Sequence, residues 1–129
     1  MANTYINENE GRGVKLAEAC SAGQLVAIHT DGLGYLANAE LGGDLQVPAF
    51  GFAETAVAAG LMVELKRNGT LNYGAGGLTI GAQVYLAEGT DGGITQTPPS
   101  TSGDYVQCVG VATAADEVAI EMDAAYIVA

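Results

Sequence analysis

Basic residues are scarce in this 129-residue chain. Four Lys and Arg side chains, at positions 12, 15, 66 and 67, stand against 15 Asp and Glu, which gives a net charge of −11. Nucleic acids and anionic lipid surfaces both require a basic protein surface, so the composition argues against both kinds of partner. The acidic balance is sufficient for solubility, and it is also compatible with a partner that presents a basic or neutral face.

The side chains that usually carry catalysis or hold metals are also scarce. There is one His and there are two Cys, too few for a disulfide framework or a zinc site. Cys20 and Cys108 lie in strand-like segments, where a lone Cys is usually a small buried hydrophobe. His29 follows an apolar run, and no Ser in the chain has the spacing of a recognisable nucleophile motif. We therefore expect no enzyme activity, no catalytic residue, no cofactor, no metal and no small-molecule substrate.

Long apolar stretches and Trp are absent as well. No run reaches membrane-spanning length, and residues 1–12 lack the basic start and apolar stretch of a signal peptide. We expect the chain to be made in the cytoplasm and to stay soluble, with no membrane partner. The hydrophobic fraction of 49% includes 22 Ala, so the core has few large side chains. A thin core of this kind often gains stability from oligomerisation, and we expect self-association.

Glycine is abundant, and much of it belongs to a duplicated pattern. The 19 Gly have no collagen-like period, so they are typical of turns and bulges between short strands. The segment AGQLVAI at 22–28 is echoed by IGAQVYL at 80–86, and each copy runs through Asp-Gly to an apolar-Gly-apolar-Ala segment. Aligned positions lie 58 and 59 residues apart. The repeat predicts an all-β fold of two similar units. The expected equivalences are Val26 with Val84 and Gly51 with Gly110.

The remaining pattern predicts short strands separated by turns. In the first half, strands are expected at 14–17, 24–29, 35–36, 47–54 and 61–65, with one helical turn at 54–59 and a loop at 39–46. A hairpin turn is expected at Asn68-Gly69. In the second half, strands are expected at 78–86, 94–97, 105–112 and 118–122, with an exposed Pro-containing connector at 98–103. The apolar tail, residues 124–129, is expected to pack on the body or on a neighbouring subunit.

A chain of this length predicts a single domain. We expect a flexible N-terminal arm at residues 1–12 and one β-rich domain at 13–129, with pseudo-repeats at about 13–65 and 71–123. Thr4, Tyr5 and Ile6 form a β-prone patch that can add a strand to the edge of a partner's sheet. A disordered terminus without such a role explains the same segment equally well.

The second half carries a resemblance to a known family. The segments that carry it are GGLTIGAQVYL at 76–86, GITQT at 93–97 and GDYVQCVGVA at 103–112. This order of glycines and strands looks like that of tailed-phage structural proteins. Together with the first half, it resembles the small capsid decoration proteins, also called cement or head-stabilising proteins. The resemblance covers roughly residues 13–123 and rests on glycine and strand phrasing rather than on functional side chains.

The resemblance implies a small β-tulip or barrel-like fold that stands as a homotrimer on the outer surface of a phage capsid. In that family an N-terminal arm commonly pairs with the major capsid protein, so Thr4, Tyr5 and Ile6 are the expected capsid contact here. The implied function is non-enzymatic, because the chain would bind the expanded shell of the virion and stabilise it. Tail-fibre and tail-spike modules have similar phrasing. The alternative is therefore a receptor-binding module that recognises a host surface glycan.

Overall fold

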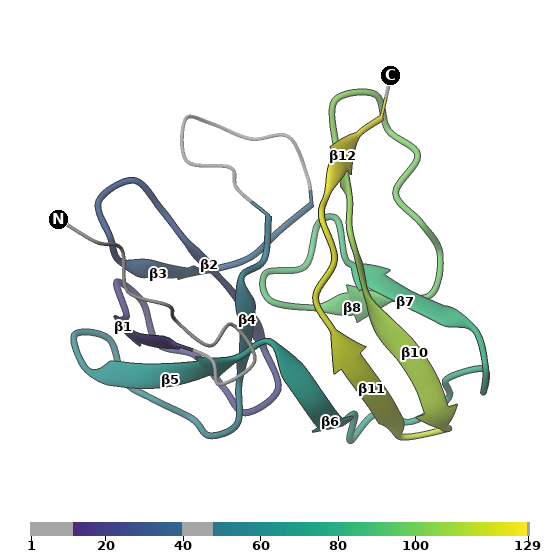
Figure 1. Cartoon of the computed structure of the whole chain (residues 1–129), viewed down its shortest axis with the longest axis horizontal. Coiled ribbons are helices and arrows are strands. Elements are labelled where there is room, and N and C mark those ends of the chain that lie inside the picture. Colours follow the sequence, from purple (N-terminus) through teal and green to yellow (C-terminus); the bar gives the residue numbers. More distant parts are fainter. Residues whose placement is uncertain (1–11, 40–47, 129) are drawn as a thin grey trace, which may run out of the picture.

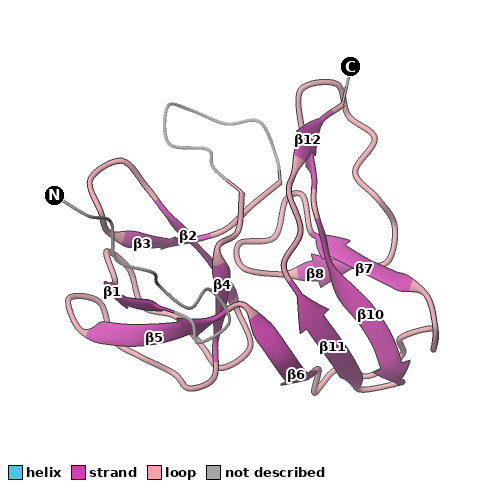
Figure 2. Ribbon diagram, viewed as in Figure 1, coloured by secondary structure: helices cyan, strands magenta, loops and turns pink. Residues whose placement is uncertain are grey.

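The described part of the chain is built from strands. A computed structural model describes residues 12–39 and 48–128, and within these ranges it has twelve β-strands and no helix (Figures 1 and 2). The strands form two five-stranded sheets and one two-stranded sheet, and every ladder is antiparallel. The all-β class expected from the short strands and glycine turns is confirmed.

The first sheet contains the strands of the first half. They are β1 (Arg12–Lys15), β2 (Leu25–Ile28), β3 (Gly34–Leu36), β4 (Gly51–Ala53) and β5 (Met62–Lys66). Their order in the sheet is β1-β5-β4-β2-β3. The sequence MVELK of β5 alternates exposed and buried side chains, so Val63 and Leu65 point inward while Met62 and Glu64 face outward.

The second sheet contains strands of the second half. They are β6 (Asn68–Asn72), β7 (Gln83–Leu86), β8 (Ile94–Thr95), β10 (Cys108–Ala114) and β11 (Glu117–Glu121). Their order in the sheet is β6-β11-β10-β7-β8. The two remaining strands, β9 (Tyr105–Val106) and β12 (Tyr126–Ile127), pair with each other. In Figure 1 the two large sheets lie side by side along the long axis of the molecule.

The two large sheets have the same topology. The strands of the second sheet correspond one by one, in chain order, to β1–β5 of the first; they are β6, β7, β8, β10 and β11. Strand β9 is an insertion between the third and fourth strands of the second unit. The register agrees as well, because Val26 lies opposite Gly51 and Val84 lies opposite Gly110. The expected equivalence of these four positions is confirmed. The repeat in the sequence therefore corresponds to a repeat in the strand pairing.

Gly51 and Gly110 are required by the same close contact in both sheets. A Cβ built on Gly51 would overlap the carbonyl oxygen of Lys66 on β5, and one built on Gly110 would overlap the carbonyl oxygen of Ala119 on β11. In each case the fifth strand of the unit approaches the fourth too closely for a side chain. This shared constraint explains why both copies keep the apolar-Gly-apolar-Ala segment.

The core consists of two clusters, and the larger one joins the halves. The smaller cluster lies within the first unit and includes Val14, Val26 and Leu65. The larger cluster combines Leu25 and Phe52 of the first unit with second-unit side chains such as Val84, Leu86 and Val118. Adjacent residues of β2, Leu25 and Val26, point into different clusters because successive strand residues face opposite sides. Strand β2 is thus buried on both faces.

Backbone and side-chain hydrogen bonds also link the two halves. The buried Gln107 side chain accepts a hydrogen bond from the Ala49 N–H at 2.8 Å and donates to the Ala49 carbonyl, also at 2.8 Å. Its amide nitrogen further donates to the carbonyl of Asp123 at 3.1 Å. Gln107 therefore holds the segment before β4 as a strand neighbour would. Leu25 N–H donates to the Gly92 carbonyl at 2.9 Å, which adds a second link.

Two local predictions from the sequence are wrong. Residues 54–59 do not form a helical turn, since they run irregularly and make an antiparallel bridge between Val57 and Cys20. Asn68-Gly69 is not a hairpin turn, because both residues belong to β6 and pair with β11. The chain bends at Arg67 and passes directly from the first sheet into the second. Asn-Gly usually forms a hairpin turn, but here β5 pairs with β1 and β4, while β6 pairs with β11. The two strands therefore do not pair with each other as a hairpin requires.

Other strands are shorter than expected. The fourth strand begins at Gly51, and residues 78–82 are irregular with a turn at 80–81 rather than strand. The segment 105–112 is divided into β9 and β10 at Gln107. Most of the expected loop at 39–46 lies outside the described residues, as does the expected arm up to residue 11. The tail pairs with β9 through β12, yet Tyr126 and Ile127 remain exposed.

Strand pairing in the described ranges closes no barrel. Each five-stranded sheet has two edge strands. A single parallel bridge between Leu16 and Gly34 connects the edges of the first sheet, and the Ala17 N–H donates to the Gly34 carbonyl at 2.9 Å. One bridge is not a ladder, so the β-tulip or barrel-like detail stays a prediction.

Candidate functional site

The capsid contact expected from the sequence, Thr4, Tyr5 and Ile6, lies outside the described residues. The described part of the chain begins with β1, an edge strand of the first sheet. Candidate binding surfaces are formed by charged and apolar side chains that the described strands expose.

Basic residues gather at one edge of the first sheet. Arg12 and Lys15 begin and end β1, Lys66 ends β5, and Arg67 follows it. Strands β1 and β5 are neighbours. Residues 68–129 contain seven Asp and Glu and no Lys or Arg. The molecule is therefore polarised, with its basic residues in the first unit and a second unit whose charged side chains are all acidic.

Two of these basic side chains have partners on the first unit. Lys66 Nζ lies 2.6 Å from Glu64 Oε1, and the Arg67 guanidinium carbon lies 4.5 Å from the centroid of the Phe50 ring, a cation–π distance. Lys15 is exposed, and no ion pair joins it to another side chain of the described ranges. Lys15 is thus available to an external acidic group.

Large apolar side chains are exposed next to Lys15. Met62 is 65% exposed and Leu61 is 58% exposed. Lys15 pairs directly with Met62 in the β1–β5 ladder, so both side chains lie on the same outward face. The Met62 Cε methyl lies over Gly13, 3.7 Å from the position a Cβ would occupy there. Leu61, Met62 and Lys15 together form an apolar projection with one positive charge, named the β5 knob below.

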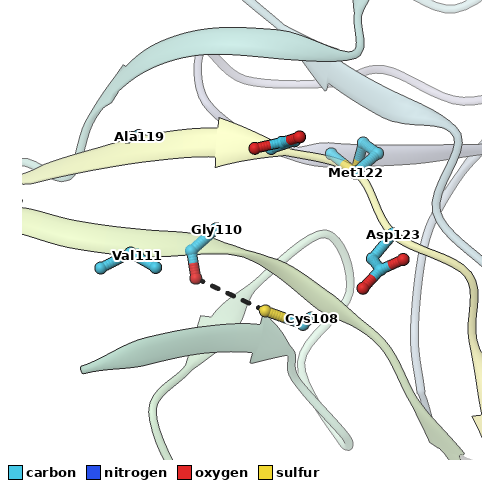
Figure 3. A pocket seen from close by; sticks show the side chains of 7 residues that line it. Cys108, Gly110, Val111, Ala119, Met122 and Asp123 are labelled. Atoms are coloured by element: carbon cyan, nitrogen blue, oxygen red, sulfur yellow. Dashed lines mark hydrogen bonds between the residues drawn. The ribbon is translucent and has the colours of Figure 1, made fainter. Parts of the chain in front are cut away.

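A shallow groove lies on the outer face of the second sheet, over β10 and β11 (Figure 3). Its volume is about 390 Å³. The floor consists of small or apolar groups, because Val111 pairs with Ala119 across the two strands and Gly110 has no side chain. Cys108, Met122 and the acidic side chains of Glu121 and Asp123 complete the lining. We name this surface the β10–β11 groove.

The other cluster of ionisable groups surrounds His29, in the turn between β2 and β3. The imidazole stacks on the Tyr35 ring with centroids 4.0 Å apart and planes 14° apart. The Tyr35 hydroxyl donates to Asp31 Oδ2 at 2.6 Å, and the Leu33 N–H donates to Asp31 Oδ1 at 2.9 Å. Asp31-Gly32 is the expected turn, and Gly32 has a φ of 81°, which suits glycine.

Burial and hydrogen bonding shift three pKa values in this turn. Desolvation lowers the pKa of His29 below its ordinary value of 6.5, although the nearby charges of Asp31 and Glu18 oppose the shift. The hydrogen bond from Tyr35 lowers the pKa of Asp31 and raises the pKa of Tyr35. His29 Nδ1 is buried without a hydrogen-bond partner in the described ranges. The arrangement braces the β2–β3 turn through the stacked rings and the Asp31 hydrogen bonds.

The two cysteines lie in different surroundings. Cys20 is buried at 5% exposure and bridges to Val57, as expected for a small buried hydrophobe. Cys108 is only partly buried, at the start of β10 beside the groove, and its Sγ donates to the Gly110 carbonyl at 3.6 Å. The expectation of a buried residue is therefore too strong for Cys108. Both thiols are free.

The sequence did not indicate the knob or the groove. Val111 and Ala119 belong to segments that read as ordinary half-buried strands, and the pairing that aligns them is set by the sheet. A partial signal exists in Leu61-Met62, since two consecutive large apolar residues at the start of an alternating strand cannot both face the core.

Comparisons with known proteins identify no relative. No protein-family model matches the chain, and no curated protein is significantly similar to it. Within residues 12–39 and 48–128, no three His, Cys, Asp or Glu side chains are placed to hold a metal ion. The same ranges contain no helix long and apolar enough to span a membrane.

Proposed function

We propose that this chain is a non-enzymatic structural protein that binds the outer surface of a phage capsid as a trimer and stabilises the expanded shell. The observation that carries the proposal is the duplicated sheet. The order of glycines and strands in its second half, together with the first half, resembles that of capsid decoration proteins. The partner is the major capsid protein, and the chain is made in the host cytoplasm and located on the virion.

The shape of the described surface supports a binding role. The residues that both repeats share, Gly51 and Gly110, are required by close contacts between strands. The basic side chains are confined to the first unit, and apolar side chains protrude from strand ends. Such features suit a protein that contacts other protein surfaces. Many copies on one shell would multiply a modest contact by avidity.

A glycan-binding tail module is less well supported. Glycan sites stack sugar rings on aromatic platforms, and the lining of the β10–β11 groove contains no aromatic side chain. Tyr35 stacks on His29, which occupies one face of its ring. Tyr126 is well exposed on the two-residue strand β12, but its partner in the ladder is Val106. The other tyrosine of this ladder, Tyr105, pairs with Ile127 instead.

The proposal is tested by counting this chain in purified virions with quantitative mass spectrometry. A ratio near one copy per major capsid protein is expected for a protein that covers the shell. A handful of copies per particle would instead indicate a tail or fibre location. Absence from the virion would overturn the structural role.

A second measurement tests stabilisation directly. Expanded capsids that lack the chain are heated with and without added protein, and DNA release is followed by dye fluorescence. We expect the added protein to raise the release temperature in a saturable manner. Saturation with no change in that temperature would show binding without stabilisation and would contradict the proposal.

A further inference from the structure

The β5 knob and the β10–β11 groove lie on different sheets of the molecule. Strand β5 starts at the left end of the long axis in Figure 1, while β10 and β11 lie in the right half. A chain therefore cannot place its own knob in its own groove. Within the described part of a single chain, both surfaces remain open to other molecules.

The two surfaces match in shape and polarity. The knob projects the flexible Met62 side chain, 65% exposed, beside Leu61. The groove has room for such a side chain in about 390 Å³ above the small residues Gly110 and Ala119. Methionine suits a shallow apolar recess because its unbranched chain adapts to irregular surfaces.

The two surfaces also match in charge. Lys15 lies directly opposite Met62 on β1 and has no ion-pair partner among the described side chains. Glu121 and Asp123 lie at the groove beside Met122, in the half of the chain that contains no basic residue. Arg67 precedes Asn68, the ladder partner of Glu121, but its guanidinium stacks over the Phe50 ring. The acidic groups at the groove therefore remain open to a lysine of a neighbouring copy.

We propose that the occupant of the β10–β11 groove is the β5 knob of a second copy of this chain. The proposal rests on the self-association that is part of the proposed function, and it names the two surfaces involved. Met62 of one copy packs on Val111 and Met122 of the next, and Lys15 faces Glu121 and Asp123. Because the two surfaces differ, the contact is heterologous and head-to-tail. Such a contact generates a closed ring, of which a trimer is one case, when its rotation closes.

The test is sedimentation of the full-length chain over a range of concentrations, compared with three variants. Met62→Glu places a charge in the apolar contact, and Glu121→Lys places a cation opposite Lys15. Met62→Glu is expected to raise the dissociation constant by about 100-fold, the size of a central interface contact. Glu121→Lys is expected to raise it by about tenfold, as for one charge pair at a rim. Ile127→Glu is the matched control, since Ile127 is 59% exposed and belongs to neither surface. It is expected to leave association unchanged.

A charge exchange separates this contact from general effects of mutation. Lys15→Glu alone should weaken association by about tenfold, as expected for one charge pair at a rim. The double variant Lys15→Glu with Glu121→Lys restores the pairing in reversed order. It is therefore expected to recover most of the affinity that each single variant loses. Circular dichroism of every variant verifies that the exposed substitutions leave the fold intact.

The results discriminate between this contact and the proposed function. If the wild-type chain self-associates while Met62→Glu and Glu121→Lys associate equally well, the knob and groove are not the interface, and the trimer itself survives. A chain that stays monomeric at every concentration also overturns the inference. Capsid binding, measured in parallel by co-sedimentation with expanded shells, reports the proposed function separately. Groove variants that keep self-association but lose capsid binding would assign the groove to the capsid protein instead.

Discussion

Gly110 shows how a single missing side chain sets the distance between two strands. The backbone of β11 approaches β10 so closely that a Cβ at this position would overlap the carbonyl oxygen of Ala119. Backbone cannot move aside as the end of a flexible side chain can, because the carbonyl belongs to a central strand with ladders on both sides. The same argument holds for Gly51 against Lys66 in the first sheet.

Replacing Gly110 with Ala is expected to destabilise the protein by about 1–3 kcal/mol, the usual cost of overpacking a well-ordered site. The free energy of unfolding is measured by urea denaturation. Gly74→Ala is the matched control, since Gly74 is exposed, and a Cβ there would meet no atom within 4 Å. Equal effects of the two substitutions would show that the close approach of β11 is not what requires glycine.

His29 links the stability of the β2–β3 turn to pH. Its pKa is lowered in the folded chain, chiefly by desolvation, so the unfolded chain binds the proton first as the pH falls. Stability from this group is therefore complete above pH 6.5 and decreases as the pH falls from 6.5 toward the folded pKa. Asp31, whose pKa is also lowered, stays ionised throughout this window.

The prediction is a difference in pH dependence between the wild-type chain and His29→Gln. Between about pH 8 and pH 5, where histidine titrates, the wild type should lose stability relative to the variant on acidification. The comparison cancels the general relief of acidic repulsion, which affects both proteins alike. Urea midpoints at several pH values provide the measurement. A wild type that gains stability relative to the variant on acidification would contradict the lowered pKa.

Strand β6 shows how pairing overrides a local turn signal. Asn68-Gly69 is a common hairpin dipeptide, yet here it begins a five-residue strand that pairs along its whole length with β11. The neighbouring β5 belongs to the other sheet, so a hairpin would require β5 and β6 to pair with each other. Each strand already has a better partner with alternating buried residues. The boundary between the units is consequently a bend at Arg67 rather than a loop.

Two glycines inserted between Gly69 and Thr70 should therefore be strongly destabilising. The insertion shifts the register of β6 against β11 and lets the buried Leu71 lose its place in the core. We expect a loss of about 2–4 kcal/mol, similar to truncation of a buried leucine. The same insertion between Gly74 and Ala75, which lie in an exposed turn, should cost less than about 1 kcal/mol. Thermal unfolding of both proteins measures the contrast, and a harmless insertion at Gly69 would restore the hairpin interpretation.

The whole molecule depends on a core that neither unit has alone. Leu25 and Phe52 of the first unit fill the same cluster as Val84 and Val118 of the second. Gln107 adds buried hydrogen bonds across the same junction. The two repeats are thus similar in topology, but the larger core cluster is shared between them, and only the smaller cluster lies within the first unit. Removing one unit would expose the large apolar face of the other.

The shared core predicts a single unfolding transition for both units. Near-ultraviolet circular dichroism of the tyrosines and far-ultraviolet circular dichroism should give coincident urea curves. Leu25→Ala, a substitution at a fully buried position, should shift both curves together and lower stability by about 2–5 kcal/mol. Two separate transitions, or a shift in one signal alone, would show that the units unfold independently.

The duplicated glycine pattern alone was sufficient to predict the all-β class and the equivalence of Val26 with Val84 and of Gly51 with Gly110. Alternation of apolar residues, turn glycines and Asp-Gly pairs are local signals, so they can be read from the chain in order. The net charge and the scarcity of His and Cys likewise depend on composition alone. The proposed capsid role comes from this same phrasing and stays a proposal.

Tertiary structure decided the features that depend on contacts between distant segments. The exclusion of a helical turn at 54–59, the strand at Asn68-Gly69 and the division at Gln107 all follow from pairing with residues far away in the chain. The knob and the groove exist because sheet register aligns Lys15 with Met62 and Val111 with Ala119. Local sequence cannot fix register between strands, because the buried face and the partner of each strand are chosen by the core that all of them share.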